Sequence, residues 1–147
     1  MANMTKTILV LNGPNLNLLG SREPEIYGTE TLDDIAAAMT AHAAPLGITL
    51  DIRQSNHEGH LIDWLHEAQA MGAAAVILNP GGYGHTSVAL HDAIKAISTP
   101  VIEVHLSDPE IRESFRHIDL VALVAHQVIK GHGAHGYKLA LDAAVRL

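Results

Sequence analysis

The sequence predicts an α/β protein built on a five-stranded parallel sheet with helices on both faces. Five short apolar segments recur along the chain, and segments with helical periodicity separate them. Strands that alternate with helices in this way pair in parallel and are buried on both faces. With 147 residues, 48% of them apolar, the chain has the size of one domain, and we expect a single domain over residues 1–147.

The first two strands enclose a helix whose ends are marked in the sequence. Residues 7–11 (TILVL) predict the first strand. Between residues 32 and 46, apolar side chains recur at offsets of 3, 4, 7, 11 and 14, which places them on one helical face. Thr31 is positioned to cap this helix and Gly47 to end it. Residues 48–53 predict the second strand.

The middle of the chain repeats the same alternation. Residues 61–71 carry an apolar helical face that includes Met71, and Gly72 is expected to end that helix. Residues 74–78 predict the third strand, and the spacing of apolar residues over 90–97 predicts the third helix.

The last third supplies two more strands. Residues 101–104 predict the fourth strand. Asp108 followed by Pro109 is typical of a helix start, so we expect a short helix through Phe115. The apolar run 120–128 predicts the fifth strand, and residues 137–145 predict a closing helix.

This succession is typical of the doubly wound, flavodoxin-like form of α/β protein, with strand order 2-1-3-4-5. Ligands of such sheets bind outside the carboxyl ends of the strands. The one long loop, residues 13–30, starts at that end, and loops of this length in a compact domain are usually functional.

Polar residues gather where the predicted strands end. The first strand leads into Asn12–Asn15, the second into Gln54–Glu58, and the third into Asn79–His85; the fourth carries Glu103, His105 and Ser107, and the long loop adds Arg22 and Tyr27. Together they predict a polar pocket for a small, hydroxyl-rich ligand.

Composition excludes several classes of protein. Cysteine is absent, so disulfides, iron–sulfur clusters and cysteine nucleophiles are excluded. A net charge of −7 argues against nucleic acid as a partner. The apolar runs are too short to span a membrane, and residues 1–6 lack the apolar core of a signal peptide, so we expect a cytoplasmic protein.

Alternatives with the same fold are less well supported. Asn12 and Asn79 stand where a phospho-receiver domain would place aspartates, and Tyr83 alone is weak support for a flavin site. A small-ligand binding module without catalysis stays open. Lysine is scarce, and only Lys130 lies near the carboxyl end of a strand, so an imine mechanism has little support.

A few side chains suggest acid–base chemistry. His85 and His105 follow buried strands beside predicted helix starts, where the helix dipole would favour a neutral imidazole; most of the eleven histidines are expected on the surface or in loops. Glu103, inside an apolar strand, either orients an imidazole or faces solvent at a sheet edge. Tyr27 is either a packing residue or a base that a cation such as Arg22 keeps anionic.

Five segments, in order and at compatible spacing, resemble the type II 3-dehydroquinate dehydratase family. They are residues 11–28 (LNGPNLNLLGSREPEIYG), 53–59 (RQSNHEG), 77–93 (ILNPGGYGHTSVALHDA), 101–107 (VIEVHLS) with 112–117 (RESFRH), and 131–137 (GHGAHGY). The resemblance implies a hydro-lyase that dehydrates 3-dehydroquinate to 3-dehydroshikimate in the shikimate pathway, by anti elimination through an enolate. It further implies one flavodoxin-like catalytic domain, no metal, no cofactor, and a homododecamer built as a tetramer of trimers.

The same resemblance implies roles for individual residues. Tyr27 is similar to the family's general base, and Arg22 to the residue that keeps it anionic. Asn15 resembles the asparagine that holds a water against the enolate oxygen. His105 resembles the general acid, and Glu103 its supporting carboxylate.

Other positions resemble those that bind substrate. They are Asn79, His85, Leu106, Ser107 and Arg116, together with Asp92, which resembles a residue that reaches a neighbouring subunit's site. The amides of Leu106 and Ser107 precede a predicted helix start, which suits a carboxylate. The sequence departs from the family pattern at His60, Gly84, His91 and Asp108 and over residues 118–121.

Overall fold

The structure, a computed structural model, describes residues 5–147 and contains a five-stranded sheet in the order β2-β1-β3-β4-β5. All neighbouring strands pair in parallel. The strands are β1 (Lys6–Asn12), β2 (Ile48–Gln54), β3 (Ala75–Asn79), β4 (Val101–His105) and β5 (Gln127–Lys130). The predicted fold class and strand order are therefore confirmed.

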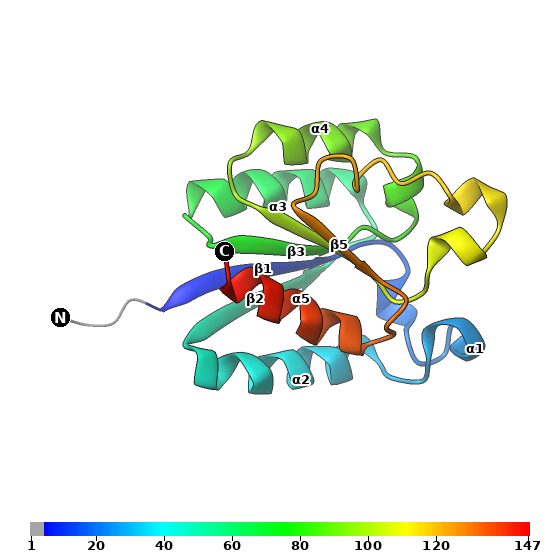
Figure 1. The fold of residues 1–147 in the computed structure, drawn as a ribbon, viewed down its shortest axis with the longest axis horizontal. Helices are drawn as coiled ribbons and strands as arrows, with labels where there is room; N and C mark the ends of the chain where they lie inside the picture. Colours follow the sequence, from blue (N-terminus) through cyan, green and yellow to red (C-terminus); the bar gives the residue numbers. More distant parts are fainter. Residues whose placement is uncertain (1–4) are drawn as a thin grey trace.

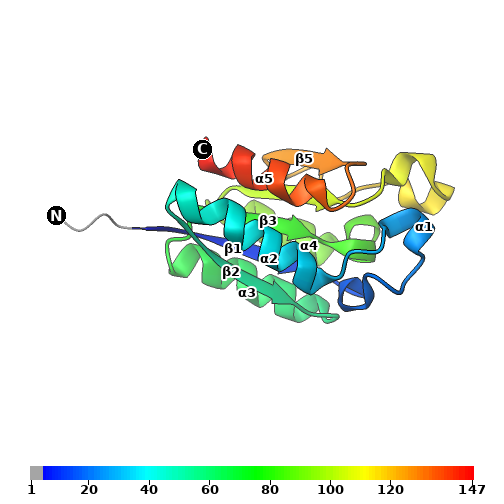
Figure 2. The same ribbon diagram turned by 90° about the horizontal axis from the view of Figure 1, so that it is seen from below.

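Helices cover both faces of this sheet. In Figures 1 and 2, α2 (Leu32–Ala43) and α5 (His135–Val145) lie on one face, and α3 (Glu58–Ala70) and α4 (Val88–Ala96) lie on the other. The short helix α1 (Pro24–Tyr27) stands apart from these layers, beyond the carboxyl ends of the strands.

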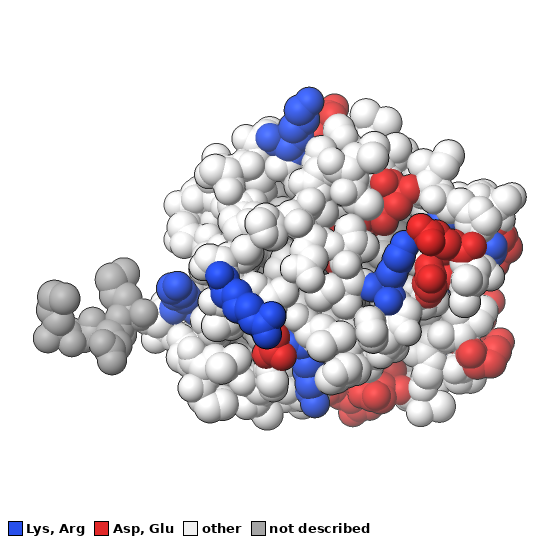
Figure 3. Space-filling view, viewed as in Figure 1, with Lys and Arg blue, Asp and Glu red and all other residues white. Residues whose placement is uncertain are grey.

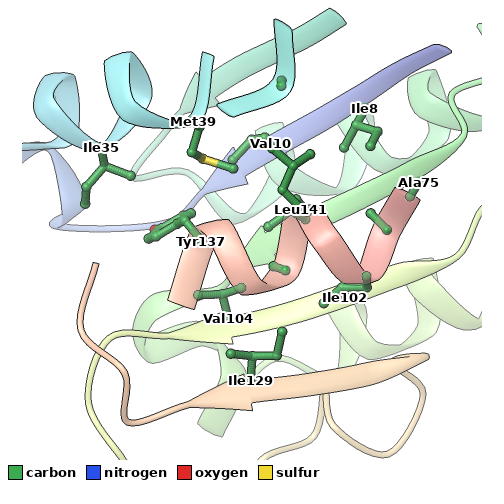
Figure 4. Packing of buried hydrophobic residues seen from close by; sticks show 14 of the residues in the cluster. Ile8, Val10, Ile35, Met39, Ala75, Ile102, Val104, Ile129, Tyr137 and Leu141 are labelled. Atoms are coloured by element: carbon green, nitrogen blue, oxygen red, sulfur yellow. The ribbon is translucent and has the colours of Figure 1, made fainter. Parts of the chain in front are cut away.

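The core has two halves, one on each side of the sheet. Figure 4 shows the half beneath α2 and α5, where Ile8 and Val10 of β1 meet Met39 and Leu141. Leu9, the residue between Ile8 and Val10, points to the other half, under α3 and α4, because successive side chains of a strand alternate in direction. Burial on both faces explains why β1 and β3 are nearly continuous apolar runs.

Thr31 and Gly47, which the sequence marked as the ends of the helical segment after the first strand, have those positions in the structure. Thr31 caps α2 through a capping box, in which its hydroxyl accepts from the Asp34 amide and Asp34 accepts from the Thr31 amide. The chain leaves the turn after α2 through Gly47, with φ +70°. Met71 is an exception: α3 ends at Ala70, and Met71 is exposed instead of belonging to the apolar face.

Two predictions for residues 109–128 are wrong. The expected short helix is two separate 3₁₀ turns, Pro109–Ile111 and Ser114–Arg116. The expected strand 120–128 is reduced to β5, because residues 120–124 form a turn before it. Val121 within that turn is fully buried in the core half under α4, so the apolar run reflects burial and not a strand.

Charged side chains of both signs lie on the face of the molecule that Figure 3 shows. In Figure 3, lysine and arginine side chains are few and lie apart, with acidic side chains between them. Of the helices in the described part of the chain, none has the length and apolar character that crossing a membrane requires.

Candidate active site

A cavity of about 190 Å³ lies at the carboxyl end of the sheet, among the loops that follow β1, β3 and β4. Nine of the residues predicted from the sequence line it: Asn15, Arg22, Tyr27, Asn79, His85, His105, Leu106, Ser107 and Arg116. A wider hollow of about 900 Å³ adjoins it on the far side of Tyr27. The smaller cavity holds both His85 and His105, which the wider hollow lacks, so we take it as the site.

Close backbone packing shapes the floor of this cavity. The Gly13 amide donates to the Asn79 carbonyl at 2.8 Å, and a Cβ atom at position 13 would lie only 2.6 Å from the Pro80 oxygen. Only glycine fits there. Asn15 follows with φ 68°, and its amide donates to the Asn56 side chain at 3.0 Å, which fixes the start of the long loop.

A buried polar network joins the ends of β1 and β3. The Tyr137 hydroxyl donates to Asn12 Oδ1 at 2.7 Å and accepts from Asn79 Nδ2 at 3.0 Å, while the Gly81 amide donates to Asn79 Oδ1 at 3.2 Å. Burial raises the pKa of Tyr137, which keeps its hydroxyl neutral. The Asn79 amide is thereby held in one orientation. The sequence did not indicate that Tyr137 orients Asn79, although Tyr137 is the last residue of the motif 131–137 (GHGAHGY).

Replacing Tyr137 with phenylalanine should lower the free energy of unfolding by about 1–3 kcal/mol, because a buried amide donor and a buried acceptor lose their partner. Urea unfolding of the two proteins measures the difference. Tyr83→Phe is the matched control, since its hydroxyl bonds the exposed Asn56 carbonyl at 2.8 Å. Equal losses in the two variants would contradict a structural role for the buried network.

Two guanidinium groups flank the Tyr27 ring. The Cζ atom of Arg22 lies 4.5 Å from the ring centroid, and that of Arg112 lies 5.1 Å away. The structure therefore brings Arg22 and Tyr27 together as predicted and adds Arg112. Arg112 was not singled out from the sequence, although it begins the motif 112–117 (RESFRH) that also contains Arg116.

Arg112 is held largely out of solvent. Its Nη1 donates to Ser107 Oγ at 3.2 Å, and its buried Nε has no hydrogen-bond partner within residues 5–147. The nearest carboxylate oxygen, Glu113 Oε1, lies 3.9 Å from Nε, beyond hydrogen-bond distance, so the guanidinium suits an anionic ligand group in the cavity.

His105 is enclosed by carboxylates. Its Nε2 lies 2.5 Å from Glu103 Oε2 and 3.4 Å from Asp119 Oδ2. Glu103 is fully buried on the inner strand β4, so it orients an imidazole and does not face solvent at an edge. Asp119 was not singled out from the sequence; it lies directly before residues 120–128, the run that was predicted as a strand.

Burial and these contacts set the charges. Burial lowers the pKa of His105, but Asp119 and Glu103 outweigh it and raise that pKa to about 9. Burial raises the pKa of Glu103 to about 7 despite the opposing effect of His105. Burial also acts to raise the pKa of Asp119, but contacts with His105 and Glu103 lower it overall. The expectation of a neutral imidazole at position 105 is therefore wrong.

His85 lies beside His105, with ring centroids 6.3 Å apart. Its Nδ1 is 2.7 Å from the Ile118 carbonyl oxygen. A carbonyl can only accept, so Nδ1 carries a hydrogen and donates it to Ile118, which fixes the orientation of the ring.

The remaining predicted residues divide into two groups. Leu106, Ser107 and Arg116 line the cavity, but the helix expected to strengthen the amides of Leu106 and Ser107 is only a three-residue turn. The dipole argument for those amides therefore fails. Asp92 lies outside the cavity of this chain, largely exposed and 2.9 Å from His91 Nδ1.

The cluster of Glu103, His105 and Asp119 is the one group within residues 5–147 whose possible ligand atoms all lie within 4.8 Å of one another. Ligands of a tetrahedral zinc ion lie about 3.3 Å apart at the usual bond lengths. The 2.5 Å separation of His105 Nε2 and Glu103 Oε2 is instead that of a short hydrogen bond, so in this structure the members of the cluster contact one another directly.

Comparisons with known proteins agree with the geometry. A family model described as dehydroquinase class II matches residues 6–145. A 3-dehydroquinate dehydratase of Caulobacter vibrioides is 57% identical over 144 residues, covering 98% of each chain. One of Chelativorans sp. is 61% identical over 146 residues, covering 98% of this chain and all of the other.

Solved structures give the same result. The type II dehydroquinase of Butyrivibrio crossotus superposes with a TM-score of 0.93 at 41% identity, covering 95% of this chain and 97% of its own. That of Propionibacterium acnes also has a TM-score of 0.93 at 41% identity, with 99% and 100% covered.

Proposed function

Since this chain belongs to the class II dehydroquinase family, we propose that it dehydrates 3-dehydroquinate by anti elimination through an enolate. The dehydratase activity itself, that of a hydro-lyase of the shikimate pathway, follows from the family membership. The observation that carries the elimination route is the placement of Tyr27, with two guanidinium groups close to its ring, in the same cavity as His105.

Tyr27 acts as the general base. As tyrosinate, its oxygen takes the proton from the carbon next to the ketone, and the electrons of that C–H bond form the enolate. The guanidinium groups of Arg22 and Arg112, whose Cζ atoms lie 4.5 and 5.1 Å from the ring centroid, are the nearby cations that this role requires. Asn15 holds a water against the enolate oxygen, which stabilises the developing charge.

His105 acts as the general acid. When the enolate re-forms the ketone, the bond to the β-hydroxyl breaks, and the imidazolium gives that oxygen its proton so that it leaves as water. A pKa raised to about 9 keeps the imidazole protonated at neutral pH. Glu103, 2.5 Å from Nε2, holds the ring in place.

The polar groups around these two residues bind the substrate. Arg112 and the amides of Leu106 and Ser107 suit its carboxylate, while Asn79 and His85 suit its hydroxyl groups. No lysine within residues 5–147 lines the cavity, and Lys130 is paired with Glu110 at 2.9 Å, which favours the enolate over an imine route.

An absorbance assay tests the reaction and its route. Protein treated with a chelator, and separate protein treated with borohydride and substrate, should both convert 3-dehydroquinate to the ultraviolet-absorbing enone. Substrate labelled stereospecifically with deuterium at one of the two hydrogens of the carbon that loses its proton then reports the stereochemistry, since anti elimination removes the hydrogen on the face opposite the departing hydroxyl. Folded protein without any signal would support the binding module instead, and loss of activity after borohydride would support an imine.

We further propose that residues 1–147 form one catalytic domain, that the protein is cytoplasmic, and that it assembles as a homododecamer of four trimers. Exposed Asp92 and the exposed apolar side chains Val88, Phe115 and Leu123 support assembly. Light scattering should give about 188 kDa for twelve chains of 15.7 kDa. A mass near that of one chain would contradict the assembly.

A further inference from the structure

A second carboxylate, outside every residue predicted from the sequence, approaches the nitrogen of His105 that Glu103 already contacts. We propose that Asp119 is a positioning residue for the elimination: with Glu103 it forms a carboxylate pair that shares one proton and holds the His105 imidazole in its cationic, proton-donating form. This inference rests on the proposed role of His105 as general acid.

The geometry gives the imidazole two distinct sides. Glu103 Oε2 at 2.5 Å and Asp119 Oδ2 at 3.4 Å both face Nε2. The other ring nitrogen, Nδ1, makes no hydrogen bond to residues 5–147, and His105 lines the cavity. The carboxylates therefore fix the ring from behind, and Nδ1 is free to serve the substrate.

Charge makes Asp119 necessary for this arrangement. Two adjacent buried carboxyl groups do not both ionise readily, and the more buried one keeps the proton. Glu103 is fully buried, whereas the Asp119 side chain is 20% exposed, and the pKa of Glu103 rises to about 7 while that of Asp119 falls. A partly protonated Glu103 cannot by itself balance a cationic imidazole, so the lasting negative charge is that of Asp119.

Cationic groups that share the cavity with the imidazole oppose a positive charge on it. The His85 ring lies 6.3 Å away, and Arg22, Arg112 and Arg116 line the same cavity. Beside three guanidinium groups, an imidazolium ion needs an additional anion. Asp119 supplies it.

The fold makes room for this carboxylate at Gly84. A Cβ atom there would lie 3.1 Å from Pro80 Cγ, a tight contact, and 3.6 Å from both Asp119 Oδ1 and Glu103 Oε2, so glycine leaves space beside the two carboxylates. The Gly84 carbonyl also accepts from the Leu120 amide at 2.8 Å, which ties the Asp119 segment to the loop after β3. Both places are among those where the sequence departs from the family pattern.

The two oxygens of Asp119 have separate roles, which allows a clean test. Oδ1 accepts from the Val121 and Ala122 amides at 3.1 Å each and stabilises the turn, while Oδ2 faces His105. Asparagine retains an oxygen for the turn and removes the charge. Asp119→Asn therefore separates the electrostatic role from the structural one.

The pKa of His105 is measured by NMR titration of protein labelled with ¹⁵N at histidine, in the absence of substrate. A His105→Asn variant identifies which signal belongs to His105. In Asp119→Asn the pKa of His105 should fall by about one unit or more, the size of shift that one nearby opposite charge produces. The alkaline limb of the kcat profile should move to lower pH by the same amount. A residue that only stabilises the turn would lower the melting temperature and leave both values in place.

Asp142→Asn is the matched control. It removes a carboxylate that lies 2.7 Å from His42, a pair formed between α2 and α5 away from the cavity. It should leave the His105 titration and the activity unchanged. An equal shift of His105 in this control would show a general charge effect and overturn the proposal.

If Asp119→Asn does not fold, titration of His105 in the unsubstituted protein still tests the proposal. There His105 should titrate well above the ordinary histidine pKa of about 6.5; titration at or below that value overturns the inference. Because the titration needs no substrate, a shifted His105 in a protein without dehydratase activity would refute the proposed function and leave the carboxylate pair standing.

Discussion

Tyr27→Phe should lower kcat by about 10²–10⁴-fold or more, the range that a general base contributes, while KM changes only a few-fold. Phenylalanine keeps the ring between Arg22 and Arg112, whose Cζ atoms lie 4.5 and 5.1 Å from the ring centroid, so the cavity keeps its shape. Only the oxygen that removes the proton is lost. Steady-state kinetics with 3-dehydroquinate measure both constants.

Tyr83→Phe provides the comparison, because it removes a tyrosine hydroxyl that bonds the Asn56 carbonyl and lies outside the cavity. It should keep nearly full activity. If Tyr27→Phe also retained near-normal turnover, Tyr27 would not be the base, and another group in the cavity would have to take the proton.

Arg22→Ala and Arg112→Ala should each lower kcat/KM by about 10–10³-fold, since each removes a cation that stabilises the tyrosinate and the enolate. The pH at which activity rises on the acid side should move upward in both variants. Arg112→Ala should also raise KM, because the Arg112 guanidinium lines the cavity and its nearest carboxylate oxygen, Glu113 Oε1, lies 3.9 Å from Nε, beyond hydrogen-bond distance. Profiles of kcat and kcat/KM against pH measure these changes.

Arg53→Ala is the matched control for these variants. Its guanidinium lies 5.5 Å from the Trp64 ring, a similar cation–π contact outside the cavity, and it pairs with Asp51 and Glu67. This variant should leave the pH profile in place even if it lowers stability. An unmoved profile in Arg22→Ala would contradict the activation of Tyr27 by that residue.

The order of elements could be predicted because the signals are local. Strands such as Ala75–Asn79 are continuous apolar runs, and the capping box at Thr31 lies within four residues. Their positions in the chain also place Asn15, His85 and His105 at one end of the sheet, since all parallel strands end at the same edge. The motif resemblance then assigned roles to Tyr27 and Arg22.

Local patterns failed where the same residues suit different structures. An apolar run at 120–128 fits a strand or a buried turn equally well. The turn forms because the Asp119 carboxylate accepts hydrogen bonds from the Val121 and Ala122 amides. Met71 has the spacing of an apolar helix face, but α3 has already ended there.

The sequence was therefore sufficient for the strand order and for most of the residues that line the cavity, because periodicity, turn residues and motif spacing lie along the chain. The charge on His105, the roles of Arg112 and Asp119 and the Asn12–Tyr137–Asn79 network came from packing. Asn12 and Tyr137 are 125 positions apart, and burial of Glu103 sets which carboxyl group keeps its proton. Distances and desolvation of this kind exist only after distant segments meet, so no local pattern records them.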